Sequence, residues 1–403
     1  MIDRADDIGR WIVSVGLDEL DQAELIAGYC ERLVEAGVPI WRASIGANTL
    51  HPLIVAQGHR WLPGEGVREE LFPRASTPEG EEQWLRSPWR WMIEGGEQRM
   101  RRRLVVGEGT NEFPLLAELA AQGATDYWTR IVPFGERGGT PEGRGLATSW
   151  TTRDPAGFAE REIALIDATL PAFGLAFKAT MAIDTTRTLV TTYLGHNAAA
   201  RILRGEIDRG QAKTVRKVLW FSDLTGFTKI ADSLPREQLL DLLNAYADCL
   251  VEVVHDHDGE VMKFMGDGIL AAFDGAEGEP CRRALDAAEA ATAMIARLNQ
   301  ERSTAGLPVT RFTLALHEGE VLYGNVGSRD RLDFTVIGPA VNEVSRIQAM
   351  SRSLDQPILI SATFAAACGN QRARLVSVGR YALRGVGRPQ ELFTLDLGEA
   401  EGA

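Results

Sequence analysis

The chain has 403 residues, of which 45% are apolar and 25% are charged, and its length suggests two or three domains. This usage excludes intrinsic disorder over most of the chain, and the net charge of −13 argues against binding to nucleic acid or to an anionic membrane. Four cysteines without paired spacing argue against a disulfide scaffold or a zinc ribbon. No uninterrupted apolar run approaches 18 residues and the acidic start carries no signal core, so we expect no membrane span and a cytoplasmic protein.

The first 182 residues form one expected domain, in which eight of the nine tryptophans lie before residue 151. Apolar spacing predicts a helix over 19–36, and a long helix follows Asp154 and continues to about Leu194. "PEGRG" is typical of a hairpin loop. Extended segments are expected at 39–45, 52–57, 102–107, 127–133 and 145–152.

Residues 183–215 are expected to form a helical connector interrupted at Gly195, Gly205 and Gly210, and a second domain is expected over 216–403. This domain alternates strands with helices, which predicts an α/β or α+β fold with helices packed on a sheet. The expected strands are "RKVLWFSDL", the hairpin "GEVMKFMGDGILAAF", 311–317 and a hairpin near 319–337. The expected helices are 235–256, 280–300 and one from about 339. In 235–256 one face carries Leu239, Leu240, Leu243, Tyr246, Leu250 and Val254.

The segment "VLWFSDLTGFT" ends a strand with a carboxylate, Asp223, and then turns into a helix. Free amides at the start of a helix bind phosphate oxygens, here from Gly226, Phe227 and Thr228. A carboxylate beside them is useful when a hard cation bridges it to the phosphates.

A second carboxylate, Asp267, lies between two glycines at the tip of the "MGDGIL" hairpin. Two carboxylates at strand ends are what a two-metal phosphoryl-transfer site needs. Either aspartate alone is more simply a turn cap, but together they favour the metal interpretation.

Asn342 and Arg346 are four residues apart in "TVIGPAVNEVSRI", so on a helix they share a face. An asparagine that orients a ribose and an arginine that meets charge on a transferring phosphate fit this spacing. A solvated helix face is the alternative for an isolated pair of this kind.

Four ordered segments resemble the catalytic domain of the class III adenylyl/guanylyl cyclases over roughly residues 214–398. They are "FSDLTGFT", "KFMGDGILAAF", "YGNVGSRDRLDFTVIGPAVNEVSR" and "LRGVGRPQELFTL". The resemblance implies a central, mostly antiparallel sheet covered by helices. It further implies that Asp223, the Leu224 backbone carbonyl and Asp267 bind two Mg²⁺ or Mn²⁺ per active site.

The same resemblance implies the substrate-binding residues. Lys263 and Thr335 fall on the positions that read the purine, and this pair resembles the ATP-selective bacterial subtype. A lysine donates to adenine N1, whereas guanine presents a donor there. Asn342 and Arg346 match the ribose-orienting and transition-state residues. Arg384 falls where the family usually has a phosphate-binding lysine, which keeps the charge but changes the geometry.

In this family each site is built between two catalytic domains, so the resemblance implies a homodimer with two composite sites. The metal carboxylates come from one domain, and the purine-reading residues, asparagine and arginine from the other. The implied reaction is in-line attack of the ribose 3′-oxygen on the α-phosphorus of ATP, with pyrophosphate leaving.

The N-terminal domain resembles a GAF-like sensor, through a last strand and closing helix in "GLATSWTTRDPAGFAEREIALIDATL". Such a domain often binds a small ligand, and Trp84, Trp89 and Trp91 either line a pocket or belong to the core. Cys30 and the other cysteines are interpreted as buried thiols, and "RMRRRL" as a solvated loop or strand edge. His255 and His257 are interpreted as helix-end residues rather than metal ligands.

The sequence therefore predicts an adenylate cyclase regulated by an N-terminal sensor domain. A guanylate cyclase is the alternative of the same class. A catalytically silent module that binds a ligand and dimerises is the alternative of a different class.

Overall fold

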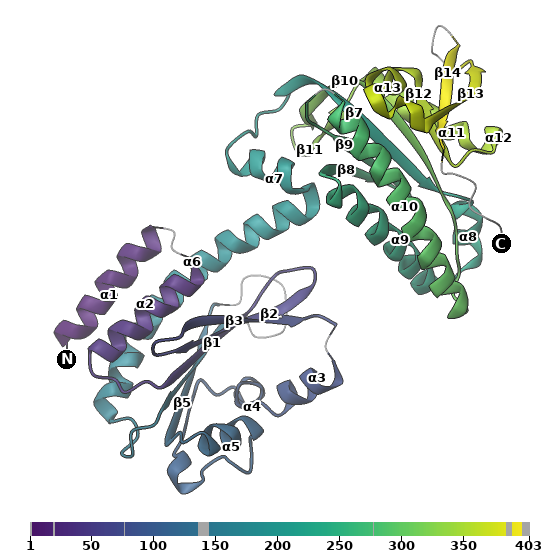
Figure 1. The fold of residues 1–403 in the computed structure, drawn as a ribbon. Helices are drawn as coiled ribbons and strands as arrows, with labels where there is room; N and C mark the ends of the chain where they lie inside the picture. The colour runs from purple at the N-terminus through teal and green to yellow at the C-terminus, as the bar shows by residue number, and fades with distance from the viewer. Residues whose placement is uncertain are drawn as a thin grey trace. The chain divides into compact units, whose positions relative to one another are not determined.

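The computed structural model describes residues 2–18, 21–75, 77–135, 145–276, 278–383 and 389–396. The chain forms two compact units, Met1–Leu189 and Val190–Ala403. Each unit combines a sheet with helices, so the predicted mixed α+β class is confirmed (Figure 1).

The N-terminal unit contains a six-stranded antiparallel sheet in the order β3-β2-β1-β6-β5-β4. Its strands are β1 (Arg42–Asn48), β2 (Ile54–Leu62), β3 (Gly66–Pro73), β4 (Arg99–Arg102), β5 (Asp126–Pro133) and β6 (Gly145–Thr152). Its helices are α1 (Ile2–Leu17), α2 (Gln22–Glu35), α3 (Pro78–Leu85), α4 (Pro88–Gly95), α5 (Pro114–Ala121) and α6 (Glu160–Leu194), with the short 3₁₀ helix η1 (Leu104–Val106).

The helices α1, α2 and α6 share one hydrophobic core with β1 and β6. Tyr29 of α2 stacks on Phe173 of α6 at 4.3 Å, and its hydroxyl lies 2.8 Å from Thr169 Oγ1. The hydrogen bond gives the buried Tyr29 hydroxyl a partner, and the stacked rings hold α6 against α2. Cys30 is fully buried in the same core, as predicted.

The long closing helix α6 was expected, and it does run to Leu194. Among the described residues it is the one helix long and apolar enough to cross a membrane, but 56% of its apolar window is buried. Its buried residues include Ile166, Leu170 and Phe177, which pack in the core of the N-terminal unit. Packing within a globular core thus accounts for its apolar composition.

Several N-terminal predictions need correction. The strand expected at 102–107 is β4, which ends at Arg102, and Leu104 turns into η1 and is buried there. The elements without a predicted counterpart in this unit are β3 and the helices α1, α3, α4 and α5. The strands β5 and β6 do pair as a hairpin, but 136–144 lie outside the described residues.

The C-terminal unit contains an eight-stranded sheet in the order β13-β14-β12-β10-β7-β9-β8, with β11 paired to β10. Its strands are β7 (Ala212–Leu224), β8 (Gly259–Met265), β9 (Gly268–Phe273), β10 (Phe312–Gly327), β11 (Leu332–Ile337), β12 (Ile358–Ser361), β13 (Leu375–Tyr381) and β14 (Gln390–Leu395). Its helices are α7 (His196–Leu203), α8 (Phe227–Ser233), α9 (Arg236–Asp256), α10 (Glu279–Thr304), α11 (Pro339–Ala349), α12 (Ser351–Leu354) and α13 (Ala362–Ala367), with η2 (Gly369–Arg374).

Strand β7 lies in the middle of this sheet and its side chains alternate between two cores. Val218 and Trp220 pack with α9, α10 and α13, whereas Leu219 packs with α7 and α11. Figure 1 shows α9 and α10 side by side along the sheet. Helices therefore cover both faces, and the end of β7 is held between the two layers.

Two predictions for this unit were wrong in detail. The face of α9 that enters the core contains Leu242, whereas Leu240 is 59% exposed, because a run of leucines leaves the helical phase ambiguous. The strand expected at 311–317 and the first half of the next hairpin are one strand, β10. It pairs with β7 from Phe312 to Gly324 without a break.

Candidate active site

Asp223 and Asp267 are brought together at one edge of the C-terminal sheet. Asp223 is the penultimate residue of β7, and Asp267 lies in the tight turn between β8 and β9, after Gly266 with a φ of +70°. A Cβ atom on Gly268, the residue after Asp267, would lie 3.4 Å from Asp223 Oδ1, so the turn brings the two carboxyl groups close together. The same Cβ atom would lie 3.2 Å from Ser222 O and 3.3 Å from Met265 O, so glycine suits the position where the turn approaches β7.

Burial, followed by the charge of Asp267 and the hydrogen bond to it, raises the pKa of Asp223 to about 6. Two half-buried carboxylates in contact repel each other unless a proton or a cation lies between them. Carboxylate and carbonyl oxygens are the ligands that Mg²⁺ prefers, and the pair thus fits a hard divalent cation. The described residues contain no group of three or more histidine, cysteine or acidic side chains that would hold a metal alone.

The turn after β7 is shaped for close approach to a ligand. Gly226 adopts a φ of +70° and caps α8 without a side-chain hydrogen bond. Thr225 N donates to Arg311 O, which ties the turn to the start of β10. The first amides of a helix have no partner within it, and those of Phe227 and Thr228 lie four and five positions after Asp223.

The two expected purine-reading residues lie on strands that do not pair with each other, since β8 pairs with β9 and β11 pairs with β10. Thr335 is buried on β11, and Lys263 is half-exposed on β8. The recorded partner of Lys263 is not Thr335 but Asp333, whose Oδ2 accepts from Lys263 Nζ at 2.7 Å. The lysine holds the pKa of Asp333 below its usual range. Asp333 is two residues before Thr335, so both lie on one face of β11.

Asp333 was missed by the sequence reasoning because its partner lies on another strand, 70 residues away. The signal that would have found it is the alternation in "LDFT", which places a carboxylate on the same face as Thr335. β8 and β11 thus offer an ammonium, a carboxylate and a hydroxyl.

Asn342 and Arg346 lie on α11, and both are at least partly exposed. The opposite face of this helix, with Ala340, Val344 and Ile347, is buried against the sheet. The residues that α11 and α12 do bring to Asp223 are Gln348, through a hydrogen bond, and Arg352, through its charge, and both lower its pKa.

Gln348 is also anchored. Its Nε2 donates to Thr313 Oγ1 at 2.8 Å, and that hydroxyl donates to Asp223 O at 3.3 Å. Residues 346 and 348 are about 200° apart around the helix, so Arg346 faces away from the carboxylate that Gln348 contacts. One chain therefore brings together the two aspartates, while Asn342 and Arg346 face elsewhere.

A cavity of about 330 Å³ adjoins the carboxylate pair. It is lined by Leu224 and Asp267, by Phe264 of β8 and by Tyr246 of α9. The predicted phosphate ligand Arg384 lies outside the described residues.

The weaker sequence signals have structural partners. Trp89 donates to Thr129 Oγ1 at 3.0 Å, whereas Trp84 and Trp91 are more than 40% exposed, so the three do not form one core cluster. His257 caps the end of α9, where its Nδ1 contacts Val253 O at 2.8 Å.

The basic run "RMRRRL" was predicted to be either a solvated loop or a strand edge, and most of it lies on the edge strand β4. Its side chains are not all solvated. Arg101 binds the fully buried Asp126 at 2.8 Å and Glu160 at 2.6 Å. These ion pairs join β4 and β5 to the start of α6.

In a comparison with known proteins, residues 211–396 match the family model described as the adenylate and guanylate cyclase catalytic domain. An adenylate cyclase of Anabaena cylindrica is 34% identical over 159 residues, which are 38% of this chain and 31% of that protein. Adenylate cyclase 1 of Rhizobium meliloti (strain 1021) is 32% identical over 151 residues, 37% of this chain and 23% of that protein. The chain thus spans less than a third of the length of either relative.

Among solved structures, a bacterial light-regulated adenylyl cyclase is similar with a TM-score of 0.50. The match is 19% identical and covers 63% of this chain and 82% of that one, so it supports the fold alone. Together with the family model and the relatives, it supports a class III adenylyl/guanylyl cyclase catalytic domain in the C-terminal unit.

Proposed function

We propose that the chain is an adenylate cyclase that converts ATP to 3′,5′-cyclic AMP and pyrophosphate. The observation that carries this proposal is the contact between Asp223 and Asp267, inside a region that matches the cyclase catalytic domain. The neighbouring Asp267 charge adds to burial in raising the pKa of Asp223, a cost in stability that is expected where the pair serves a cation.

In this proposal Asp223, the Leu224 carbonyl and Asp267 hold two Mg²⁺ or Mn²⁺, which when bound lower the pKa of the 3′-hydroxyl and neutralise the triphosphate. The amides of the Gly226 turn bind phosphate oxygens, and Arg384 adds a positive charge to the same end of the substrate. The ribose 3′-oxygen attacks the α-phosphorus in line with the leaving pyrophosphate.

Asn342 orients the ribose and Arg346 stabilises the negative charge of the transition state. Since both face away from Asp223 in their own chain, we propose that they serve the carboxylates of a second copy. The working assembly is then a homodimer with two composite sites.

The choice of purine depends on Lys263, Asp333 and Thr335. For adenine, Lys263 donates to N1, and Thr335 accepts from the N6 amine. The Asp333 carboxylate orients the lysine through their hydrogen bond. This arrangement favours ATP.

The same contact supports a second candidate, a guanylate cyclase. Guanine has an acceptor at O6 and a donor at N1, which Lys263 and Asp333 match as a pair. Lys263 alone therefore excludes GTP less strongly than the sequence suggested.

We further propose that residues 1–182 form a GAF-like sensor that binds a small ligand, that 183–215 form the connector and that 216–403 form the catalytic domain. In this proposal the sensor domain regulates the catalytic domain through the connector. The acidic chain has no role in binding nucleic acid, and we propose a cytoplasmic location.

Turnover of ATP and of GTP by the purified chain, with Mg²⁺ and with Mn²⁺, tests this proposal. We expect cyclic AMP as the main product. Cyclic GMP as the main product would favour the guanylate alternative. Nucleotide binding without either product would favour the silent signalling module.

A further inference from the structure

Two helix ends meet on the face of the C-terminal sheet that is covered by α10 and α13. Cys281, in the first turn of α10, has its Sγ 4.0 Å from Phe364 O of α13. A Cβ atom on Gly278 would lie 3.9 Å from Ala367 O. Cys368 caps the end of α13, and both thiols are 2% exposed in the same core cluster. The first turn of α10 therefore crosses the last turn of α13 at the two cysteines.

Cys281 Sγ lies against Phe364 O, one helical turn before Cys368, so the two side chains lie beside each other although they are 87 positions apart in the sequence. The remaining cysteines, Cys30 and Cys249, lie in α2 and α9, and Cys30 belongs to the other unit. Cys281 and Cys368 are thus the cysteines that the described residues bring into contact.

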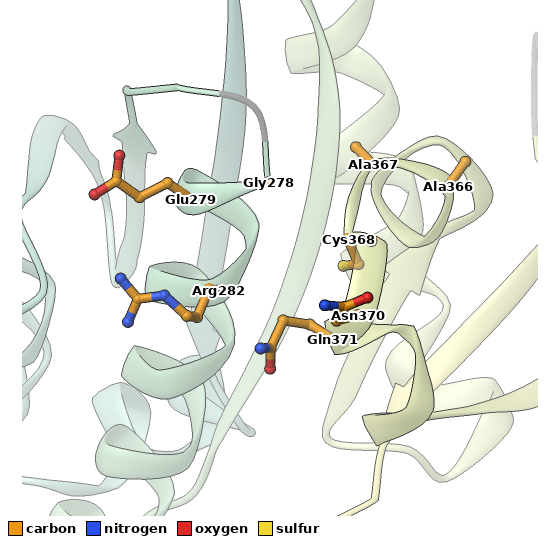
Figure 2. A pocket seen from close by; sticks show the side chains of 9 residues that line it. Gly278, Glu279, Arg282, Ala366, Ala367, Cys368, Asn370 and Gln371 are labelled. Atoms are coloured by element: carbon orange, nitrogen blue, oxygen red, sulfur yellow. The ribbon is translucent and has the colours of Figure 1, made fainter.

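A cavity of about 490 Å³ opens at this crossing (Figure 2). Figure 2 shows Cys368 on its wall between Ala367 and Asn370, with Arg282 of α10 on the facing side. Cys368 lines this cavity and Cys281 is not among its lining residues, so a small solute in the cavity lies nearer to Cys368, although both residues are 2% exposed.

The surroundings of Cys368 favour its thiolate. The neighbouring Cys281 thiol lowers the pKa of Cys368, burial opposes this, and the positive charges of Arg372 and Arg374 lower it again. The neighbouring thiol and burial raise the pKa of Cys281. Because Cys368 also lines the cavity, it is the nucleophile, and Cys281 is the protonated partner held beside it.

We propose that Cys281 and Cys368 are a redox-active dithiol, which hydrogen peroxide converts to an intramolecular disulfide that joins α10 to α13. The Cys368 thiolate attacks one peroxide oxygen, the O–O bond breaks, and the released hydroxide takes a proton to leave as water. The Cys281 sulfur then attacks the sulfenic sulfur. The S–S bond forms, the S–O bond breaks, and the thiol proton leaves with the oxygen as a second water. The two cysteines lose two electrons and the peroxide gains them.

This inference is independent of the proposed cyclase activity, since it concerns thiols outside the candidate active site. A link between residues so far apart in sequence restricts the unfolded chain, so oxidation stabilises the C-terminal unit. The melting temperature is expected to rise by about 5 °C or more on oxidation.

Treatment of the folded full-length chain with hydrogen peroxide, followed by alkylation and non-reducing peptide mapping, tests the proposal. We expect the free thiols to fall from four to two, and a single crosslinked peptide that contains Cys281 and Cys368. Dithiothreitol should restore all four thiols and the original melting temperature. Cys249→Ser is the matched control, because it removes a helical cysteine of the same unit and should leave the crosslink intact.

Cys281→Ser removes the resolving thiol, and Cys368 should then be trapped as a sulfenic acid by dimedone. Cys368→Ser should give neither the crosslink nor the trapped product. The mapping of the wild-type chain does not depend on whether these variants fold. A wild-type chain that loses thiols without the 281–368 crosslink, or that keeps all four, would overturn the proposal.

Discussion

The contact between Asp223 and Asp267 makes a prediction about stability as well as activity. A carboxyl whose folded-state pKa is raised destabilises the fold as the pH rises from its unfolded value near 3.8 through about 6. Metal-free protein should therefore lose stability over this window. Because Asp223 is half-exposed, solvent screening reduces the full linkage energy to about 1 kcal/mol.

The change Asp223→Asn removes the charge repulsion between residues 223 and 267. We expect the metal-free variant to melt at least about 2 °C above the wild type at pH 7, and at the same temperature below pH 4, where the wild-type carboxyl is protonated. The variant should lose the stabilisation by Mn²⁺ and all cyclase turnover. Calorimetry with and without Mn²⁺ measures both effects.

The exposed Asp330→Asn is the control, which should change neither property. A variant that retains a tenth or more of the wild-type turnover, or that melts below the wild type without metal, would contradict the two-carboxylate site.

The ion pair of Lys263 with Asp333 changes how the purine assignment should be tested. Lys263→Glu alone would place two carboxylates side by side, which disfavours binding of any nucleotide. We therefore predict that Lys263→Glu with Thr335→Cys, in an Asp333→Asn background, shifts the ATP/GTP ratio of kcat/KM toward GTP by at least about tenfold. Steady-state kinetics with both nucleotides measures the ratio.

Asp333→Asn alone is the control for the background, and it should lower kcat/KM for ATP without reversing the preference. An unchanged ratio in the triple variant would mean that these strands do not read the base.

At the scale of elements, α7 is fixed to β10 and to β11, the strand that carries the proposed purine-reading residue Thr335. The Arg201 guanidinium lies 5.2 Å from the ring of Tyr323 and 5.1 Å from that of Phe334, the residue between Asp333 and Thr335. Asn325 of β10 donates to Glu206 O at 2.8 Å. The end of the connector thus packs on its own catalytic unit.

Arg201→Ala should then raise KM for the nucleotide at least about threefold and lower the melting temperature by about 3 °C, because two cation–π contacts and an ion pair with Glu206 are lost. Arg204→Ala is the matched control, since Arg204 is exposed on the same helix. Equal effects of the two variants would make Arg201 a surface residue without influence on the purine site.

The parts of the fold that the sequence predicted are those fixed by local chemistry. Gly266 and Gly268 determine the turn that carries Asp267, and the periodicity of α6 determines its length. The parts that it missed depend on distant partners. The pairing of Lys263 with Asp333 and the contact of Cys281 with Cys368 join segments 70 and 87 positions apart, and the local alternation in "LDFT" places Asp333 beside Thr335 but does not identify its partner.

At the scale of the whole molecule, the proposed site residues of one chain fall into two groups that face different directions, and this is why we propose that a second copy completes each site. Asp223 and Asp267 lie together, with Gln348 and Arg352 beside them, while Asn342 and Arg346 face away. If each site takes its carboxylates from one chain and its arginine from the other, two inactive variants can complement each other. The dimer of Asp223→Ala with Arg346→Ala contains one intact site and one doubly defective site.

Mixing these two variants in equal amounts should restore about a quarter of the wild-type turnover, since half of the dimers are mixed and each mixed dimer has one intact site of two. Mixing Asp223→Ala with Asp267→Ala is the control. Both carboxylates of a site come from the same chain, so no mixed dimer contains an intact pair and no activity should return. Recovery in both mixtures, or in neither when subunit exchange is verified by a tagged copy, would contradict a site shared between two chains. Recovery in the first mixture alone would establish which chain each residue serves.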